Sequence, residues 1–144
     1  MFKIAGCILI MTSTVFIFSQ KVLEHYFTYK FLSEILDIII KIQYENGSNI
    51  PYAKIYVKIG FDNINFFAKV KTNGYIKRSE IDAVQIFFKN LGKRDKNSEK
   101  EYIEYNQKII SARAQRYYSD YNEIKKSRFM CGIASGLMII ILFI

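Results

Sequence analysis

The chain has 144 residues and a formal net charge of +8, with 21 lysines and arginines set against 13 carboxylates. This length leaves room for one small domain at most. The basic residues are spread over the middle of the chain without an Arg-rich helix face, which argues against a nucleic-acid partner and favours a surface near anionic lipid. Cys7 and Cys131 fall inside apolar runs, so their spacing provides neither a disulfide framework nor a metal site.

The first predicted element is a transmembrane helix over residues 1–19, an apolar run in which Lys3 is the one charged residue. A secretory signal peptide begins in the same way, but residues 18–20 lack the small-x-small cleavage site and the helical pattern runs on through them. Cys7 follows a lipobox-like Ile-Ala-Gly, yet the apolar run comes after it, which argues against lipidation.

The helix of the first anchor is predicted to continue to about Asn46, where Gly47 can end it in a left-handed conformation. The next stretch, from Pro51 to Thr72, fits two structures. Pro51 in a first turn is typical of a helix, whereas alternating apolar residues ahead of Asn73-Gly74 are typical of a hairpin. Sequence alone leaves residues 52–78 open between helix and hairpin, and we expect helix.

A second helix is predicted from Ser79 to Leu91, with Ser79 and Asp82 forming a shortened capping box. Gly92 stands where a left-handed helix end is wanted, and Asp95 can cap the helix that follows. The prediction is a long helical hairpin, of coiled-coil type, in which this helix packs back on the start of the last one.

The last helix is predicted to run without a break from Asp95 to the end of the sequence, because no proline interrupts it. Apolar groups recur on it at spacings of three and four, which gives one buried face. Glu99, Glu101 and Glu104 alternate with lysines, and we therefore expect them on a solvated face with i,i+4 ion pairs.

Residues 129–144 carry no charge and are predicted to form a second, short transmembrane helix. They cover roughly 24 Å against a hydrocarbon core of about 30 Å, so the flanking Lys125, Lys126 and Arg128 would snorkel to the interface. Nearly all basic residues lie between the two apolar runs, so the positive-inside rule places residues 20–128 in the cytoplasm as a helical domain and both termini on the other side.

Three glycines are candidates for helix packing within the membrane: Gly6 in the first anchor, and Gly132 and Gly136, four residues apart, in the second. Small residues one turn apart allow the close backbone approach by which helices associate in lipid. The partner of this groove would be the other anchor or a second copy of the protein, which makes a homo-oligomer possible.

Catalytic chemistry is not visible in the sequence. His25 is the one histidine, and there is no Gly-rich phosphate loop, no ligand pair at metal spacing and no nucleophile motif, so we expect neither an enzyme nor a bound cofactor or metal. An enzyme subunit with a tyrosine-lined site would need a polar cluster in the bundle core, for which the sequence offers no convincing candidate.

Four features of the chain occur in a characteristic order: Lys3 with Gly6, residues 42–44 followed by Ile50-Pro51, the motif Phe-Phe-Lys-Asn-Leu-Gly-Lys-Arg-Asp at residues 87–95, and the Gly132–Gly136 segment before an aliphatic tail. Together they resemble stage III sporulation protein AB of endospore-forming bacteria. In the family motif a glycine stands where this chain has Phe88 and a glutamine where it has Glu99, and the stretch between Pro51 and Phe87 is short for the family.

The resemblance implies a helical bundle similar to the cytoplasmic domain of the platform protein of type II secretion systems. It also implies a non-catalytic platform role in the mother-cell membrane around the forespore, within the channel apparatus that joins the two cells, and a partner in a secretion-type AAA ATPase, the stage III AA protein, along with other channel proteins. The expected docking surface is the turn at the membrane-distal tip, formed by Leu91, Gly92, Lys93, Arg94 and Asp95. The alternative is a generic double-anchored membrane scaffold or sensor unrelated to sporulation.

Overall fold

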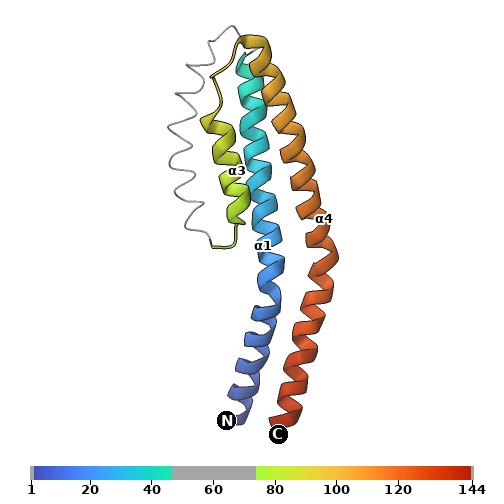
Figure 1. Cartoon of the computed structure of the whole chain (residues 1–144). Coiled ribbons are helices and arrows are strands. Elements are labelled where there is room, and N and C mark those ends of the chain that lie inside the picture. The colour runs from blue at the N-terminus through green and yellow to red at the C-terminus, as the bar shows by residue number, and fades with distance from the viewer. Residues whose placement is uncertain (1, 47–73, 144) are drawn as a thin grey trace.

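Two long helices and one short one make up the regular structure of the protein over residues 2–46 and 74–143, the residues that the computed structural model describes. Helix α1 spans Phe2–Asn46, α3 spans Arg78–Lys89 and α4 spans Lys96–Phe143. In Figure 1, α1 and α4 run side by side in opposite directions, so that both chain ends lie together, and α3 lies beside the half of α1 that is remote from them. The predicted all-α fold is confirmed over these residues.

Both long helices form because no proline and no cluster of turn residues interrupts them. Helix α1 has 45 residues and α4 has 48, which at 1.5 Å per residue gives lengths of about 70 Å each. The predicted end of the first helix at Asn46 is confirmed. The expected helix from Pro51 to Thr72 and its hairpin alternative lie outside the described residues.

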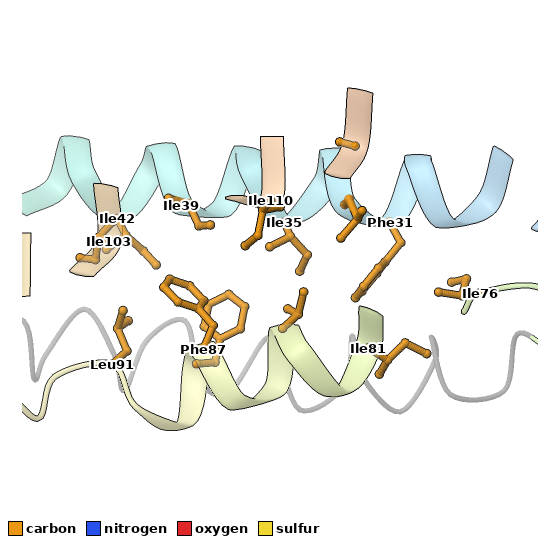
Figure 2. Packing of buried hydrophobic residues seen from close by; sticks show 14 of the residues in the cluster. Phe31, Ile35, Ile39, Ile42, Ile76, Ile81, Phe87, Leu91, Ile103 and Ile110 are labelled. Atoms are coloured by element: carbon orange, nitrogen blue, oxygen red, sulfur yellow. The ribbon is translucent and has the colours of Figure 1, made fainter. Parts of the chain in front are cut away.

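The hydrophobic core lies in the half of the molecule that contains α3. Helix α1 contributes a stripe at spacings of three and four, in which Leu32, Ile35, Ile39 and Ile42 are all 0% exposed. Figure 2 shows the ring of Phe87, on α3, pointing toward this stripe. The remaining buried apolar residues are Phe31, Ile76, Ile81, Val84, Phe88, Leu91, Ile103, Ile110, Ala114 and Tyr117. The three helices therefore share one small core in this half of the molecule.

The terminal halves of α1 and α4 are different. Within residues 2–46 and 74–143 they pair only with each other, and they leave large apolar side chains exposed on their outer faces. On α1 these are Ile4, Ile8, Leu9, Phe16 and Ile17, and on α4 they are Phe129, Met130, Leu137, Met138, Ile141 and Leu142. Helix α1, over Ile4–Tyr44, is the one helix among the described residues that length and composition qualify as a candidate membrane span. We call residues 4–18 and 129–142 the apolar ends of the two helices.

The start of α3 differs from the sequence-based prediction. The helix begins at Arg78 with Lys77 as its N-cap, and no side chain caps it, so the capping box of Ser79 and Asp82 was wrong. The backbone N–H of Lys77 instead donates a 3.2 Å hydrogen bond to Thr28 Oγ1, a fully buried hydroxyl on α1. This contact with α1 fixes where α3 begins, and it overrides the local signal at Ser79.

Candidate functional site

The tip turn, Leu91–Asp95, connects α3 to α4 at the end of the molecule remote from the chain ends. Gly92 has a φ of +77°, as its position predicted, because a side chain disfavours that left-handed backbone. Asp95 caps α4 as predicted: its Oδ2 accepts a 3.2 Å hydrogen bond from the backbone N–H of Ser98. Local sequence signals therefore determine both ends of the turn.

Glu99, in the first turn of α4, holds the tip turn through a hydrogen bond. The prediction that it lies on a solvated face was wrong. Its side chain is 0% exposed, and Oε1 accepts a 2.7 Å hydrogen bond from the backbone N–H of Gly92. The position lies one helical turn before the buried Ile103, so it belongs to the core face of α4. Glu104, by contrast, is exposed and lies 3.9 Å from Lys100, as the i,i+4 spacing predicted.

Arg94 folds back over the base of the turn. Its guanidinium carbon lies 3.8 Å from the centroid of the Tyr102 ring, and Nη1 donates a 3.1 Å hydrogen bond to the carbonyl oxygen of Asn90. The same Nη1 is 3.9 Å from Glu99 Oε2, which has no hydrogen-bond partner among the described residues. A cation stacked on an aromatic ring and close to a buried carboxylate holds the turn in one conformation.

The surface of the tip is basic. Residues 92–98 are all exposed, and the cations Lys93, Arg94 and Lys96 stand there against the single carboxylate of Asp95. Hydrogen bonds from the Ser98 side chain and backbone lower the pKa of Asp95 from its usual value, so this carboxylate stays charged. The five residues predicted as a docking surface thus form one ordered turn, in which Leu91 is buried in the core and the other four are exposed.

At the opposite end, two of the three predicted packing glycines lie between α1 and α4. A Cβ atom added at Gly132 would approach Val15 Cα to 3.0 Å, and one at Gly136 would approach Thr14 Oγ1 to 2.7 Å. The two helices therefore come close there only because these positions lack side chains. A Cβ atom at Gly6 would have nothing within 4 Å, so the structure does not bring Gly6 into this contact.

A polar cluster, which the sequence did not predict, links the buried Glu80 of α3 to the buried Tyr117 and the exposed Arg113 of α4. Glu80 is 8% exposed, and its Oε2 accepts a 2.9 Å hydrogen bond from Arg113 Nη1 while its Oε1 accepts one of 3.1 Å from the Tyr117 hydroxyl. Burial and the adjacent Glu80 carboxylate raise the pKa of Tyr117 to about 12. Arg113 and Tyr117 stand four apart on the apolar stripe, and an arginine on that stripe was the available signal that a carboxylate partner lies opposite.

A pocket of about 390 Å³ opens beside this cluster, between the start of α3 and the middle of the two long helices. It is lined by His25, Lys77, Ser79, Glu80, Arg113, Arg116, Tyr117 and Asp120. His25 Nδ1 lies 3.9 Å from Asp120 Oδ2, and its ring is tilted by 48° to that of Tyr117, with 5.6 Å between the ring centroids. Among the described residues no three histidine, cysteine, aspartate or glutamate side chains come together as a metal site would require.

Comparison with known proteins gives one match. A family model described as stage III sporulation protein AB matches residues 65–144, more than half of the chain. The matched range includes the motif at residues 87–95 and the Gly132–Gly136 segment, but not the first anchor. No curated protein and no solved structure matches the chain.

Proposed function

Because this chain belongs to the stage III sporulation protein AB family, we propose that it is a non-catalytic membrane platform protein of the channel between mother cell and forespore. Membership of the family indicates a role in sporulation. In the proposal, two membrane spans hold the protein in the mother-cell membrane, and the basic tip turn docks a secretion-type ATPase, the stage III AA protein. The family match favours this function over a generic membrane scaffold or sensor.

Two spans are supported by how the apolar ends lie. Neither end carries a charged side chain, the two ends run together, and their outer faces expose large apolar groups that water would not solvate favourably. The hydroxyls of Thr12, Ser13 and Thr14 each donate to a carbonyl oxygen three or four residues earlier, at 2.7–3.0 Å. Such internal bonds satisfy polar groups where lipid offers no partner.

The cytoplasmic side is inferred from charge, since Lys125, Lys126 and Arg128 stand directly before the second apolar end. A cysteine in place of the exposed Asn97, with Cys7 and Cys131 replaced by serine, should resist a membrane-impermeant thiol reagent in intact cells and react after lysis. Labelling before lysis would show that residues 20–128 lie on the outer side of the membrane.

One observation supports docking at the tip. The exposed basic turn lies at the far end of a long helix pair, and the buried Glu99 holds it in one conformation. Helix α4 places the turn about 50 Å from the residue where its apolar end begins. An interface that forms on a preordered turn loses less conformational entropy than one that must first order a loop. Because Lys93, Arg94 and Lys96 are positively charged, we expect the surface of the ATPase that binds them to be acidic.

The test is co-purification of the ATPase with full-length protein from sporulating cells. Lys93→Glu combined with Lys96→Glu reverses the charge of the tip without touching Glu99 or Arg94, and it should abolish retention of the ATPase. The matched control reverses the same charge on the shaft of α4, at the exposed Lys100 and Lys108, and should retain it. Equal retention by both variants would show that the ATPase binds elsewhere.

A further inference from the structure

The pocket between α1, α3 and α4 has a lining rich in hydrogen-bond donors. Its cationic side chains are Lys77, Arg113 and Arg116, and Ser79 adds a hydroxyl. Two carboxylates, those of Glu80 and Asp120, face these three cations. The lining therefore carries a formal excess of one positive charge while His25 is neutral, and of two when His25 is protonated.

Both carboxylates of this lining already have a partner. Glu80 accepts one hydrogen bond at each oxygen, from Arg113 and from Tyr117, so its charge is paired with that of Arg113. Asp120 faces His25 at the rim, at 3.9 Å. Among the described residues neither Lys77 nor Arg116 forms a salt bridge, and the Lys77 ammonium lies 5.8 Å from the centre of the Tyr117 ring.

Geometry holds these donors at one place. The Glu80–Arg113 bond fixes the start of α3 against α4, and the Thr28 hydroxyl fixes the backbone of Lys77 against α1. Lys77, the N-cap residue of α3, and Arg116 on α4 thereby line one cavity from two sides, and both are exposed. A guanidinium and an ammonium in a shared cavity bind the oxygens of an anion through short, charge-assisted hydrogen bonds.

We propose that this pocket binds a phosphate-bearing anion, held by Lys77 and Arg116 with the free donors of Arg113. The volume of about 390 Å³ falls in the range of about 300–1,000 Å³ of small-molecule sites, so the pocket takes a ligand larger than a single ion. This site is separate from the tip turn, and the proposal does not depend on ATPase docking.

The phosphate group could belong to a soluble phosphorylated compound or to an anionic lipid headgroup, because both present the same charged oxygens to the pocket. Along α4, Asp120 precedes Phe129 by about 13 Å of helix and Arg113 precedes it by about 24 Å. The headgroup region is only about 5–8 Å deep on each side of the hydrocarbon core, so the rim of the pocket lies just above it and the cationic end lies farther away. The experiment therefore has one arm for each source.

In the first arm, full-length protein in an uncharged detergent is titrated calorimetrically with inorganic pyrophosphate. In the second, the protein is placed in nanodiscs of phosphatidylcholine with or without phosphatidylglycerol, and amine modification of Lys77 is measured by mass spectrometry. The test variant is Lys77→Met with Arg116→Met in the first arm and Arg116→Met alone in the second, where Lys77 is the reporter. Both leave the Glu80–Arg113–Tyr117 cluster intact. The control is Lys100→Met with Lys108→Met, which removes the same charge from the exposed shaft of α4.

The proposal expects saturable binding of pyrophosphate, or protection of Lys77 by phosphatidylglycerol, and the arm that responds identifies the source. In the first arm the test variant should bind about tenfold more weakly or worse, and the control should stay within about twofold of the wild type. In the second, Lys77 should be protected in the control and Lys108 should not be protected in the wild type. No response in either arm, or equal weakening by both variants, would overturn the proposal.

Discussion

The buried carboxylate of Glu99 accepts a 2.7 Å hydrogen bond from the backbone N–H of Gly92, seven residues earlier. This bond joins the first turn of α4 to the left-handed residue of the tip turn. It explains why a charged side chain is fully buried there, since an acceptor at position 99 satisfies a backbone donor that neither α3 nor α4 can.

Replacing Glu99 should destabilise the tip in proportion to the acceptor that is lost. Glu99→Ala removes it and should lower the free energy of unfolding by about 1–3 kcal/mol, the usual cost of losing a hydrogen bond to a charged group. Glu99→Gln keeps a side-chain oxygen within reach of Gly92 and should cost less. Thermal unfolding of the full-length protein in detergent measures both, and an alanine variant as stable as the wild type would show that the bond contributes nothing.

Gly92→Ala should cost about 1–2 kcal/mol through backbone conformation alone, because its φ is +77° and an added Cβ atom meets nothing within 4 Å. Gly74 provides the control. It also has open space around it, and it is not among the glycines with positive φ, so Gly74→Ala should leave the unfolding temperature unchanged. Equal effects at the two positions would argue against strain at Gly92.

Leucine at Gly132 should force the apolar ends apart, since even a Cβ atom there approaches the backbone of Val15 to 3.0 Å. Overpacking of this kind costs about 1–3 kcal/mol. Gly6→Leu adds the same side chain where nothing lies within 4 Å and should be tolerated. Unfolding in detergent compares the two variants; a Gly132→Leu protein that unfolds like Gly6→Leu would mean that the close approach is dispensable.

Tyr117 should make stability fall at high pH. Its pKa is raised to about 12 in the folded protein, so between the ordinary tyrosine value and 12 the unfolded chain releases this proton first. The stabilisation is therefore fully present below about pH 10 and is lost as the pH rises through about 12. Tyr117→Phe should flatten the decline across this window, whereas Tyr105→Phe, at an exposed tyrosine, should not; identical pH profiles for all three proteins would contradict the shift.

Local signals in the sequence were sufficient for the two long helices and for the tip. Gly92 and Asp95 act within a few residues of chain, so their conformations follow from residue type and position. The apolar stripe of α4 likewise identified its core face. The glycines of the second apolar end indicated close packing, but the sequence could not choose their partner, which in this structure is α1.

Non-local contacts account for what the sequence did not predict. Ser79 carries a good capping signal, yet Thr28 on another helix determines how α3 begins. Glu80 meets Arg113 from 33 residues away, a pairing that no periodicity reveals. The position of Glu99 on α4 predicts the core face, whereas its charge predicts the solvated face. It is buried because its carboxylate accepts a hydrogen bond from the backbone N–H of Gly92.

The most direct test of the platform proposal places a photo-crosslinking amino acid at Lys93, on the exposed tip turn, in sporulating cells. The same residue at Lys108, exposed on the shaft of α4, is the control. Tip docking predicts that illumination links position 93 to the stage III AA ATPase and leaves position 108 without that product. A crosslink to the ATPase from position 108 but not from position 93 would contradict it.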